Sequence, residues 1–445
     1  MTVDLLSAMA CLEKLRMTHK NMTSAKNSFI GRRFFLQSLA TVAALSCAPL
    51  VARANNMMFA QSGRARWDDQ FDAGPSGGGK VASNQPVLSF ATVEDTQRAI
   101  AQYEDIVSRG GWQRVPTEQG KLRIGVTHPA VIALRQRLAA SGDLQSGVGM
   151  SQSFDTYVDA AVKRFQARHG LPADGVTGES TYKSLNVDAQ TRLNQLHINV
   201  DRLKPKVDMT SKEQRFVMVN IPAAQIEAVE NGVVVQRHTA VVGKIDRQTP
   251  LLDSKISQII LNPFWTVPKS IIRKDIIPLM QKNPSYLSDN SIHIFNSRGE
   301  EVSPESIDWH SDEAVGMMFR QDPGKINAMS STKINFANPY SVYMHDTPIQ
   351  TLFNSLMRFD SSGCIRIQNI RDLNVWILKN TPGWDRQRME AVIASRQNTP
   401  INIPDPIPLH FVYISAWSTG EGVVQFRDDI YHMDGSSQLA LDTAG

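Results

Sequence analysis

The sequence predicts a multidomain α+β protein, in which a small three-helix module precedes a mainly β domain that carries a helical insertion. Two observations support this fold class. Apolar residues recur at helical spacing up to about residue 188, whereas from Arg215 onward they form the continuous or alternating runs typical of strands. At 445 residues, with 42% hydrophobic and 20% charged residues, the chain is long enough for two or three globular domains.

The first 54 residues have the features of a cleaved export signal. An arginine pair at 32–33 precedes the apolar run 39–51, and Ala-Arg-Ala at 52–54 gives the small-x-small cleavage pattern. These features predict a twin-arginine signal peptide and therefore a periplasmic protein. Polar residues interrupt the apolar run, which is shorter than the roughly 20 residues that span a bilayer. We therefore expect no stable membrane span after signal cleavage.

The basic character of the chain comes from this leader. The formal net charge is +4 for the whole chain, and residues 1–54 contribute +5 of it, which leaves −1 for the remainder. A chain with that balance has no excess of cations to bind nucleic acid or an anionic membrane surface, and we expect neither as a partner. Residues 55–90, which are polar and glycine-rich, are expected to form a flexible linker.

A helical scaffold is expected over residues 91–210, with a compact module at about 125–188. Apolar faces predict two module helices that end at Gly142 and Gly170, and the turn at 174–178 leads into a third, short helix with a capping threonine. The stretch Phe-Gln-Ala-Arg-His-Gly-Leu at 165–171 makes this module resemble the peptidoglycan-binding module common in wall hydrolases.

A mainly β domain is expected over residues 213–435, followed by a tail at 436–445. Asn231 and Gly232 lie between two apolar runs, which is a strong two-residue hairpin signal. Further strands are expected at 216–221, 255–261, 291–295, 341–345 and 409–416, and helices at 269–281 and 370–378. The helix at 269–281 is either part of a lid over a pocket or an amphipathic surface helix. Trp417, on an alternating strand, is expected to pack in the core.

Cys364 is the only cysteine beyond the predicted cleavage site, because Cys11 and Cys47 fall in the leader. A lone thiol in an exported protein forms no internal disulfide and is open to oxidation, so its presence indicates a chemical role. The alternative is a buried, inert cysteine.

His345 and Cys364 form a candidate catalytic pair. The nucleophile in acyl transfer is a thiolate, and a free cysteine with a pKa of about 8.5 is mostly protonated at neutral pH, so a base such as His345 is needed. Gly363 allows a sharp turn beside the sulfur, so that the N–H groups of Gly363 and Cys364 could stabilise an oxyanion.

These residues resemble the signature of L,D-transpeptidases with a YkuD-type catalytic domain. Tyr-Met-His-Asp at 343–346 precedes Ser-Ser-Gly-Cys-Ile-Arg at 361–366, whereas the family has a histidine, then Ser-His-Gly-Cys and an arginine at this distance. Asn-Pro-Phe-Trp-Thr-Val-Pro at 262–268 and Arg-Gln-Asp-Pro-Gly at 320–324 resemble the large periplasmic branch of that family, which carries an N-terminal peptidoglycan-binding module. The resemblance covers nearly the whole mature chain.

The resemblance implies a specific reaction. Cys364 attacks the meso-diaminopimelate carbonyl of a donor tetrapeptide stem and expels D-alanine, and an amine of an acceptor stem resolves the thioester into a 3-3 cross-link. His345 takes the thiol proton, and Arg366, Tyr343 and Trp265 shape the donor pocket. The resemblance implies no cofactor and no metal, and His169, His293, His310 and His432 lack metal-ligand spacing.

Ser362 departs from the family pattern, because a histidine stands at this position in the family. Either Ser362 keeps a hydrogen bond in the substrate-binding loop, or the thiolate loses reactivity. The alternatives that stay open are an L,D-carboxypeptidase, a transpeptidase that anchors an outer-membrane protein to peptidoglycan through a lysine, and a catalytically impaired wall-binding protein.

Overall fold

The computed structural model describes residues 84–435, except for residues 146 and 148. The predicted signal peptide, most of the predicted linker and the predicted tail lie outside these residues. Within them, no helix is both long and apolar enough to cross a membrane.

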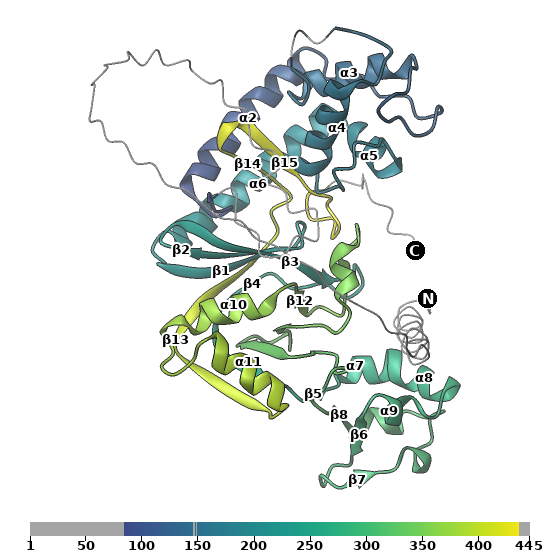
Figure 1. Cartoon of the computed structure of the whole chain (residues 1–445), viewed down its shortest axis with the longest axis vertical. Coiled ribbons are helices and arrows are strands. Elements are labelled where there is room, and N and C mark those ends of the chain that lie inside the picture. The colour runs from purple at the N-terminus through teal and green to yellow at the C-terminus, as the bar shows by residue number, and fades with distance from the viewer. Residues whose placement is uncertain (1–83, 146, 148, 436–445) are drawn as a thin grey trace, which may run out of the picture. The chain divides into compact units, whose positions relative to one another are not determined.

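The N-terminal part of the described chain is helical, as the sequence predicts (Figure 1). Its helices are α2 (Phe90–Ser108), α3 (Ala130–Ala140), α4 (Thr156–Arg168), α5 (Glu179–Leu185) and α6 (Ala189–Thr210). Asp155 caps α4 by accepting from the N–H groups of Tyr157 and Val158. The module core is a single cluster of apolar side chains that includes Leu134, Phe165 and Leu185.

The expected capping threonine of α5 is wrong. The N-cap position is Gly178, which has no side chain to cap with, and Thr177 instead accepts a hydrogen bond from the Leu122 N–H at 3.0 Å. Leu122 and Thr177 also form an isolated β-bridge. The Thr177 hydroxyl therefore helps to pair two loops of the module and does not cap the helix.

The end of the expected linker is packed against the protein. Val87 and Leu88 are buried, and the Val87 N–H donates to Glu227 Oε2 at 3.0 Å. Ser89 then caps α2 by accepting from the Thr92 N–H. An apolar pair beside a capping residue explains why residues 84–90 belong to the fold and not to a spacer.

The second part of the chain is built on a nine-stranded sheet of order β11-β3-β12-β10-β9-β4-β13-β1-β2. An additional pairing of β2 with β3, the second strand in this order, closes the strands from β3 to β2 into a ring, and β11 lies outside the ring, paired with β3. The strands are β1 (Arg215–Asn220), β2 (Gln225–Glu230), β3 (Val233–Gly243), β4 (Leu252–Leu261), β9 (Thr332–Phe336), β10 (Met344–His345), β11 (Phe359–Ser361), β12 (Ile365–Ile367) and β13 (Thr399–Val412). Helices α10 (Ile370–Ile377) and α11 (Arg386–Ser395) pack beside the sheet (Figure 1).

The predicted hairpin is confirmed, since Asn231 and Gly232 turn between β2 and β3 with φ angles of 53° and 75°. Two expected strands have different bounds. The strand expected at 341–345 is reduced to β10, because Ser341 has a φ of 57° and turns the chain. The strand expected at 409–416 is the end of β13, and the chain is then diverted where the Ser415 N–H donates to Asn199 Oδ1 at 2.8 Å.

The helical insertion lies between β4 and β9 and has its own core. It contains β5 (Trp265–Thr266), α7 (Lys269–Ile271), the π-helical turn η2 (Ile272–Ile276), α8 (Ile277–Lys282), α9 (Tyr286–Asp289), β6 (Ile292–Phe295), β7 (Glu301–Val302) and β8 (Met318–Gln321). Strands β5, β8, β6 and β7 form a separate four-stranded sheet. The helix expected at 269–281 is therefore confirmed, with a π-helical turn in its middle.

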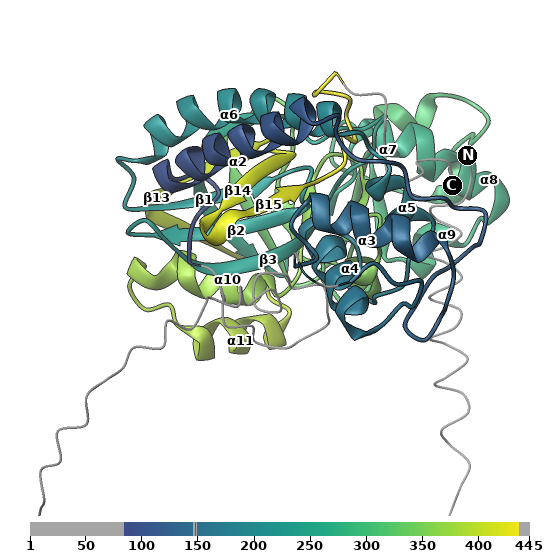
Figure 2. The ribbon, with the colours of Figure 1, turned by 90° about the horizontal axis from the view of Figure 1, so that it is seen from above.

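A hairpin of β14 (Ala416–Thr419) and β15 (Val423–Phe426) packs against α2 and α6 (Figure 2). Trp417 is buried in the core, as expected. The Arg168 guanidinium of α4 pairs with Asp143 at 2.6 Å and donates to the Val424 carbonyl at 3.1 Å. These contacts join the module to the hairpin that ends the sheet domain.

Candidate active site

Three neighbouring strands bring the predicted catalytic residues together. His345 on β10 lies opposite Lys333 on β9 and opposite Arg366 on β12. Opposed residues of paired strands project to the same face, so these three side chains form a row. Alternation along β10 and β12 places Tyr343 and Cys364, each two residues earlier, on that face as well. The rings of Tyr343 and His345 are 5.5 Å apart.

Cys364 is a free, half-buried thiol whose environment contains opposing influences. Burial raises the pKa of the Cys364 thiol, while hydrogen bonds from Tyr343 and the positive charges of Lys333 and Arg366 act to lower it. Lys333 Nζ lies 4.1 Å from the centroid of the Tyr343 ring. The net direction is upward, so Cys364 at rest is a protonated thiol beside two cations that would stabilise its anion.

His345 is buried and held in one orientation. A carbonyl oxygen can only accept, so the 2.6 Å contact between Nδ1 and the Asp346 carbonyl means that Nδ1–H donates and Nε2 carries the lone pair. Burial, together with the charges of Arg366 and Lys333, lowers the pKa of His345 to about 3. In the described part of the chain no hydrogen bond joins the imidazole to the Cys364 thiol, whose hydrogen-bonding neighbour is Tyr343.

Gly363 makes the tight turn before the nucleophile. Its φ is +104°, and a Cβ atom would lie 3.3 Å from the Gln248 carbonyl oxygen, so any other residue is disfavoured. The Gly363 N–H donates to Ser361 Oγ at 3.1 Å, and its carbonyl accepts from Thr249 Oγ1 at 2.9 Å. The Gly363 N–H, which the sequence suggests as an oxyanion donor, is thus engaged within the loop in this conformation.

Ser362 connects the nucleophile loop to the helical insertion. Its exposed Oγ accepts from Arg247 Nη1 at 2.8 Å, and the same nitrogen donates to Asp275 Oδ2 at 3.1 Å. Asp275 belongs to the π-helical turn η2. The serine at this position thus takes part in a three-residue bridge, Ser362–Arg247–Asp275.

The three residues expected to shape the donor pocket lie around the thiol to different degrees. Tyr343 hydrogen-bonds to Trp265, and burial raises the pKa of Tyr343. Arg366 is half-buried, and burial lowers its pKa while the charge of Asp360 opposes that shift. Trp265 reaches the site through Tyr343, from the strand that opens the insertion.

Sequence reasoning missed Lys333, Arg247 and Thr249. Lys333 is the second residue of Thr332–Phe336, whose alternating buried and half-buried residues are a recognisable strand signal. Arg247 and Thr249 stand in a loop with no motif, and only the tertiary structure brings them to Ser362 and Gly363. No group of three or more potential metal ligands occurs among the residues described.

The part of the chain that carries these residues matches a known family. Residues 214–391 match the family model for the YkuD L,D-transpeptidase catalytic domain. This part of the chain is an L,D-transpeptidase catalytic domain. Residues 127–185 match the model described as "Putative peptidoglycan binding domain", which agrees with the expected module.

Two named proteins match parts of the chain. A "Putative L,D-transpeptidase" of Haemophilus influenzae is 32% identical over 246 residues, which are 55% of this chain and 49% of that protein. The N-acetylmuramoyl-L-alanine amidase CwlM of Mycobacterium tuberculosis is 39% identical over 80 residues, 16% of this chain and 20% of that protein. The chain therefore spans about half the length of the first of these relatives and a fifth of the second.

Solved structures with some similarity include other L,D-transpeptidases. That of Stackebrandtia nassauensis is 13% identical, with a TM-score of 0.24, and the match covers 68% of this chain and 97% of the other. That of LdtMt1 in complex with imipenem is 13% identical, with a TM-score of 0.22, over 45% of this chain and 59% of the other. At such TM-scores these structures add nothing to the family match.

Proposed function

We propose that this L,D-transpeptidase forms 3-3 cross-links between peptidoglycan stems through a thioester on Cys364. The observation that carries the proposal is the arrangement of Cys364, directly before β12, and His345 on the neighbouring strand β10, with Lys333 and Arg366 beside them. The binding module at residues 127–185 supports peptidoglycan as the substrate. The predicted signal peptide supports action in the periplasm, on tetrapeptide stems as donor and acceptor.

The first half-reaction begins from an uncharged pair. As Sγ of Cys364 attacks the meso-diaminopimelate carbonyl, the thiol proton passes to the free Nε2 of His345. An imidazolium between Lys333 and Arg366 is unfavourable, which drives the proton onward to the amine of the leaving D-alanine. The S–C bond forms, the C–N bond breaks, and the acyl-enzyme is left with a neutral His345.

The second half-reaction reverses these roles. The amine of an acceptor stem attacks the thioester carbonyl, His345 takes a proton from that amine, and the proton returns to the departing Cys364 sulfur. Because the apo thiol hydrogen-bonds with Tyr343, we infer that donor binding draws Sγ toward His345. Arg366 and Lys333 provide positive charge for the carboxylates of the stems.

The test is intact-mass analysis of the mature protein with a disaccharide tetrapeptide, and separately with a carbapenem, alongside Cys364→Ala and Ser362→His variants. We expect an adduct that depends on Cys364 and tetrapeptide–tetrapeptide dimers as product. Release of D-alanine without dimers would favour a carboxypeptidase. If the enzyme accepted only the lysine of a protein as the acyl acceptor, the product would be a protein that carries the stem peptide, and no dimers would form.

Ser362→His separates an active enzyme from an impaired one. An adduct in the native protein means that Ser362 is compatible with catalysis through its bond to Arg247. If the adduct appears only after Ser362→His, the native protein is a wall-binding protein with an impaired site, and the transpeptidase proposal is wrong.

A further inference from the structure

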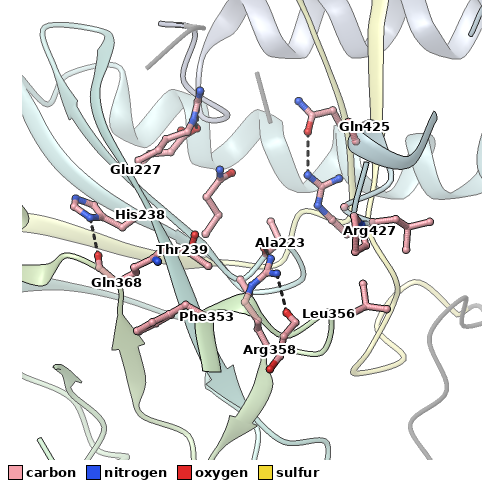
Figure 3. Close-up of a pocket in the computed structure, with 18 of the residues that line it drawn as sticks. Ala223, Glu227, His238, Thr239, Phe353, Leu356, Arg358, Gln368, Gln425 and Arg427 are labelled. Carbon is pink, nitrogen blue, oxygen red and sulfur yellow. Dashed lines mark hydrogen bonds and ion pairs between the residues drawn. The ribbon is translucent and has the colours of Figure 1, made fainter. Parts of the chain in front are cut away.

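A cavity of about 380 Å³ lies apart from the Cys364 site, where the module, the sheet and the β14–β15 hairpin meet (Figure 3). Its walls come from residues 167–172 at the end of α4, from β2 and β3, from residues 353–358, and from Trp417 and Arg427. None of Cys364, His345, Lys333 or Arg366 lines it. The cavity therefore needs an explanation separate from the proposed chemistry.

Arg358 gives this cavity a positive charge that protein groups satisfy only in part. Its guanidinium donates to the carbonyl oxygens of Ser355 and Ala223, both at 3.3 Å, and its buried Nε has no hydrogen-bond partner. Burial lowers the pKa of Arg358, with no carboxylate acting in the other direction. A half-buried guanidinium with a buried, unpartnered Nε and two long bonds to neutral carbonyls favours an anionic ligand.

Arg427 adds a second guanidinium to the lining (Figure 3). It donates to the carbonyl oxygens of Arg168 and Phe426 and to Gln425 Oε1. Burial and the nearby charge of Arg358 lower the pKa of Arg427 to about 9, although Asp428 opposes this shift. Two like charges in one cavity repel each other, and both are stabilised when an anion binds beside them.

The other charged and titratable groups in the walls are already compensated or neutral. The Glu227 carboxylate accepts from Arg237 Nε at 2.9 Å and from the Val87 N–H at 3.0 Å. Burial lowers the pKa of His238, which contacts the Gln368 carbonyl through Nδ1 at 3.0 Å. The charge that the cavity offers to a ligand is thus that of the two arginines.

The other residues that line the cavity favour a peptide that carries a carboxylate over a small inorganic anion. Side-chain amides are contributed by Gln225, Asn354 and Gln368, and apolar surface by Leu171, Phe353 and Leu356. Amides match the donors and acceptors of a peptide backbone, and the apolar groups match short side chains such as that of alanine. Inorganic phosphate would make no use of the apolar part of the lining.

We propose that this cavity is an accessory site that binds a short peptide by its free carboxylate, with Arg358 as the principal anchor and Arg427 as the second. The carboxylate part of this proposal stands on the cavity itself. The choice of a peptidoglycan stem as the peptide rests on the proposed function. A stem bound here would contact both the module and the catalytic domain.

The position of Arg358 links this site to the nucleophile. Residues 353–358 lie between His345 and Cys364 in the chain, and the Arg358 carbonyl accepts from the Val242 N–H at 2.9 Å immediately before β11. Strand β11 ends at Ser361, whose Oγ accepts from the Gly363 N–H. A ligand held by Arg358 therefore restrains the segment that leads directly to Cys364.

The test is isothermal titration of a tetrapeptide stem into the Cys364→Ala protein, which binds but does not react, and into the same protein carrying Arg358→Gln. We expect Arg358→Gln to weaken one binding event by about tenfold or more, as loss of a charge-assisted hydrogen bond does. A peptide with its carboxylates amidated should bind both proteins equally weakly. The matched control is Arg396→Gln, an exposed arginine outside the cavity, which should bind as the parent does.

Two further arms keep the outcomes distinct. Arg358→Lys retains the charge and should recover part of the affinity, and thermal melting shows whether each variant is folded. Equal peptide binding with and without Arg358→Gln in folded proteins would overturn the site. Competition by inorganic phosphate as effective as that by the peptide would overturn the peptide assignment. Because acylation of Cys364 is measured separately, this proposal and the proposed function can fail independently.

Discussion

At the scale of single residues, the site is controlled by charges that face one another across three short strands. Burial, together with the flanking charges of Arg366 and Lys333, lowers the pKa of His345 and keeps it neutral, while both cations favour the ionised form of Cys364. The pair is thus kept uncharged at rest and is prepared for a negative charge on sulfur or on substrate. This arrangement makes Lys333, which no family motif marks in the sequence, a test of the electrostatics.

Replacing Lys333 with Met should raise the pKa of the Cys364 thiol further, because one of the charges that lowers it is removed. We expect the pH profile of Cys364 alkylation by iodoacetamide to shift to higher pH, and acylation at neutral pH to slow. Lys255→Met, an exposed lysine on β4, is the control and should leave the profile unchanged. An unshifted profile for Lys333→Met would show that its charge does not reach the sulfur.

Gly363→Ala should destabilise the fold by about 1–3 kcal/mol, since a non-glycine residue is strained at positive φ. Its added Cβ would also lie 3.3 Å from the Gln248 carbonyl oxygen, which displaces the nucleophile loop. Urea unfolding and the acylation rate measure the two effects. Gly299→Ala is a matched control, because Gly299 has a φ of +79° and a Cβ added there would meet no atom within 4 Å, so only the backbone strain applies. Equal acylation by both variants would contradict a steric role for the loop.

At the scale of elements, the insertion is tied to the active-site loop at two points. Trp265 on β5 hydrogen-bonds with Tyr343, and Asp275 in the π-helical turn η2 reaches Ser362 through Arg247. The extra residue of a π-turn displaces one side chain from the regular helical position, and such turns are frequent at functional sites. The Ser362–Arg247–Asp275 bridge thus supports the lid interpretation of helix 269–281 over that of a surface helix.

Arg247→Met should loosen the insertion without unfolding the protein. A partly exposed ion pair contributes about 0.5–1 kcal/mol, so we expect amide exchange in residues 269–282 to accelerate about twofold to fivefold. Acylation should slow, because the bond to Ser362 is lost as well. Arg273→Met, which removes an exposed arginine of the same turn that lies 3.8 Å from Asp312, should leave exchange near η2 close to that of the parent. If both variants exchange alike, the bridge does not hold the lid.

At the scale of the whole molecule, the binding module is joined to the catalytic domain through buried polar contacts. The Arg168–Asp143 pair has side-chain exposures of 3% and 1%, and Arg168 also donates to the Val424 carbonyl. Burial of an ion pair is costly unless its remaining donors are satisfied, and here a backbone carbonyl of the hairpin satisfies one of them. The module is thereby held in a defined position beside the cavity that Arg358 lines.

Sequence reasoning reached as far as local signals allow. The pair Asn231-Gly232 predicted a hairpin, because asparagine and glycine are the residues that most readily adopt the positive φ that this turn needs. Gly363 likewise indicated a turn before Cys364, and its φ is positive in the structure. The Ser362–Arg247–Asp275 bridge was beyond reach, since its members come from three separate segments and none carries a motif. The position of Lys333 beside the site could be recognised only from the strand register, which places it opposite His345. In the sequence alone, a lysine between Thr332 and Ile334 is equally typical of a strand with one face in solvent.

The stability of the whole molecule should depend on pH through buried neutral histidines. Burial lowers the pKa of His345 to about 3, and it also lowers those of His169 and His238. In an unfolded chain a histidine has a pKa of about 6.5, so below that pH the unfolded state binds more protons than the folded state. The stabilising contribution is present above about pH 6.5 and is lost as the pH falls toward the folded pKa, by about 1.4 kcal/mol per pH unit for each such histidine.

Urea unfolding at pH 8, 6.5 and 5.5 measures this slope, and His345→Gln should reduce it by close to one proton. His293, whose pKa is raised by Glu301, and the buried Asp434, whose pKa is raised by burial, act in the opposite direction and are present in both proteins. His310→Gln, at an exposed position, is the control. A slope unchanged by His345→Gln would mean that the ring takes up a proton in the folded state, and His345 could then not act as the neutral base that the mechanism requires.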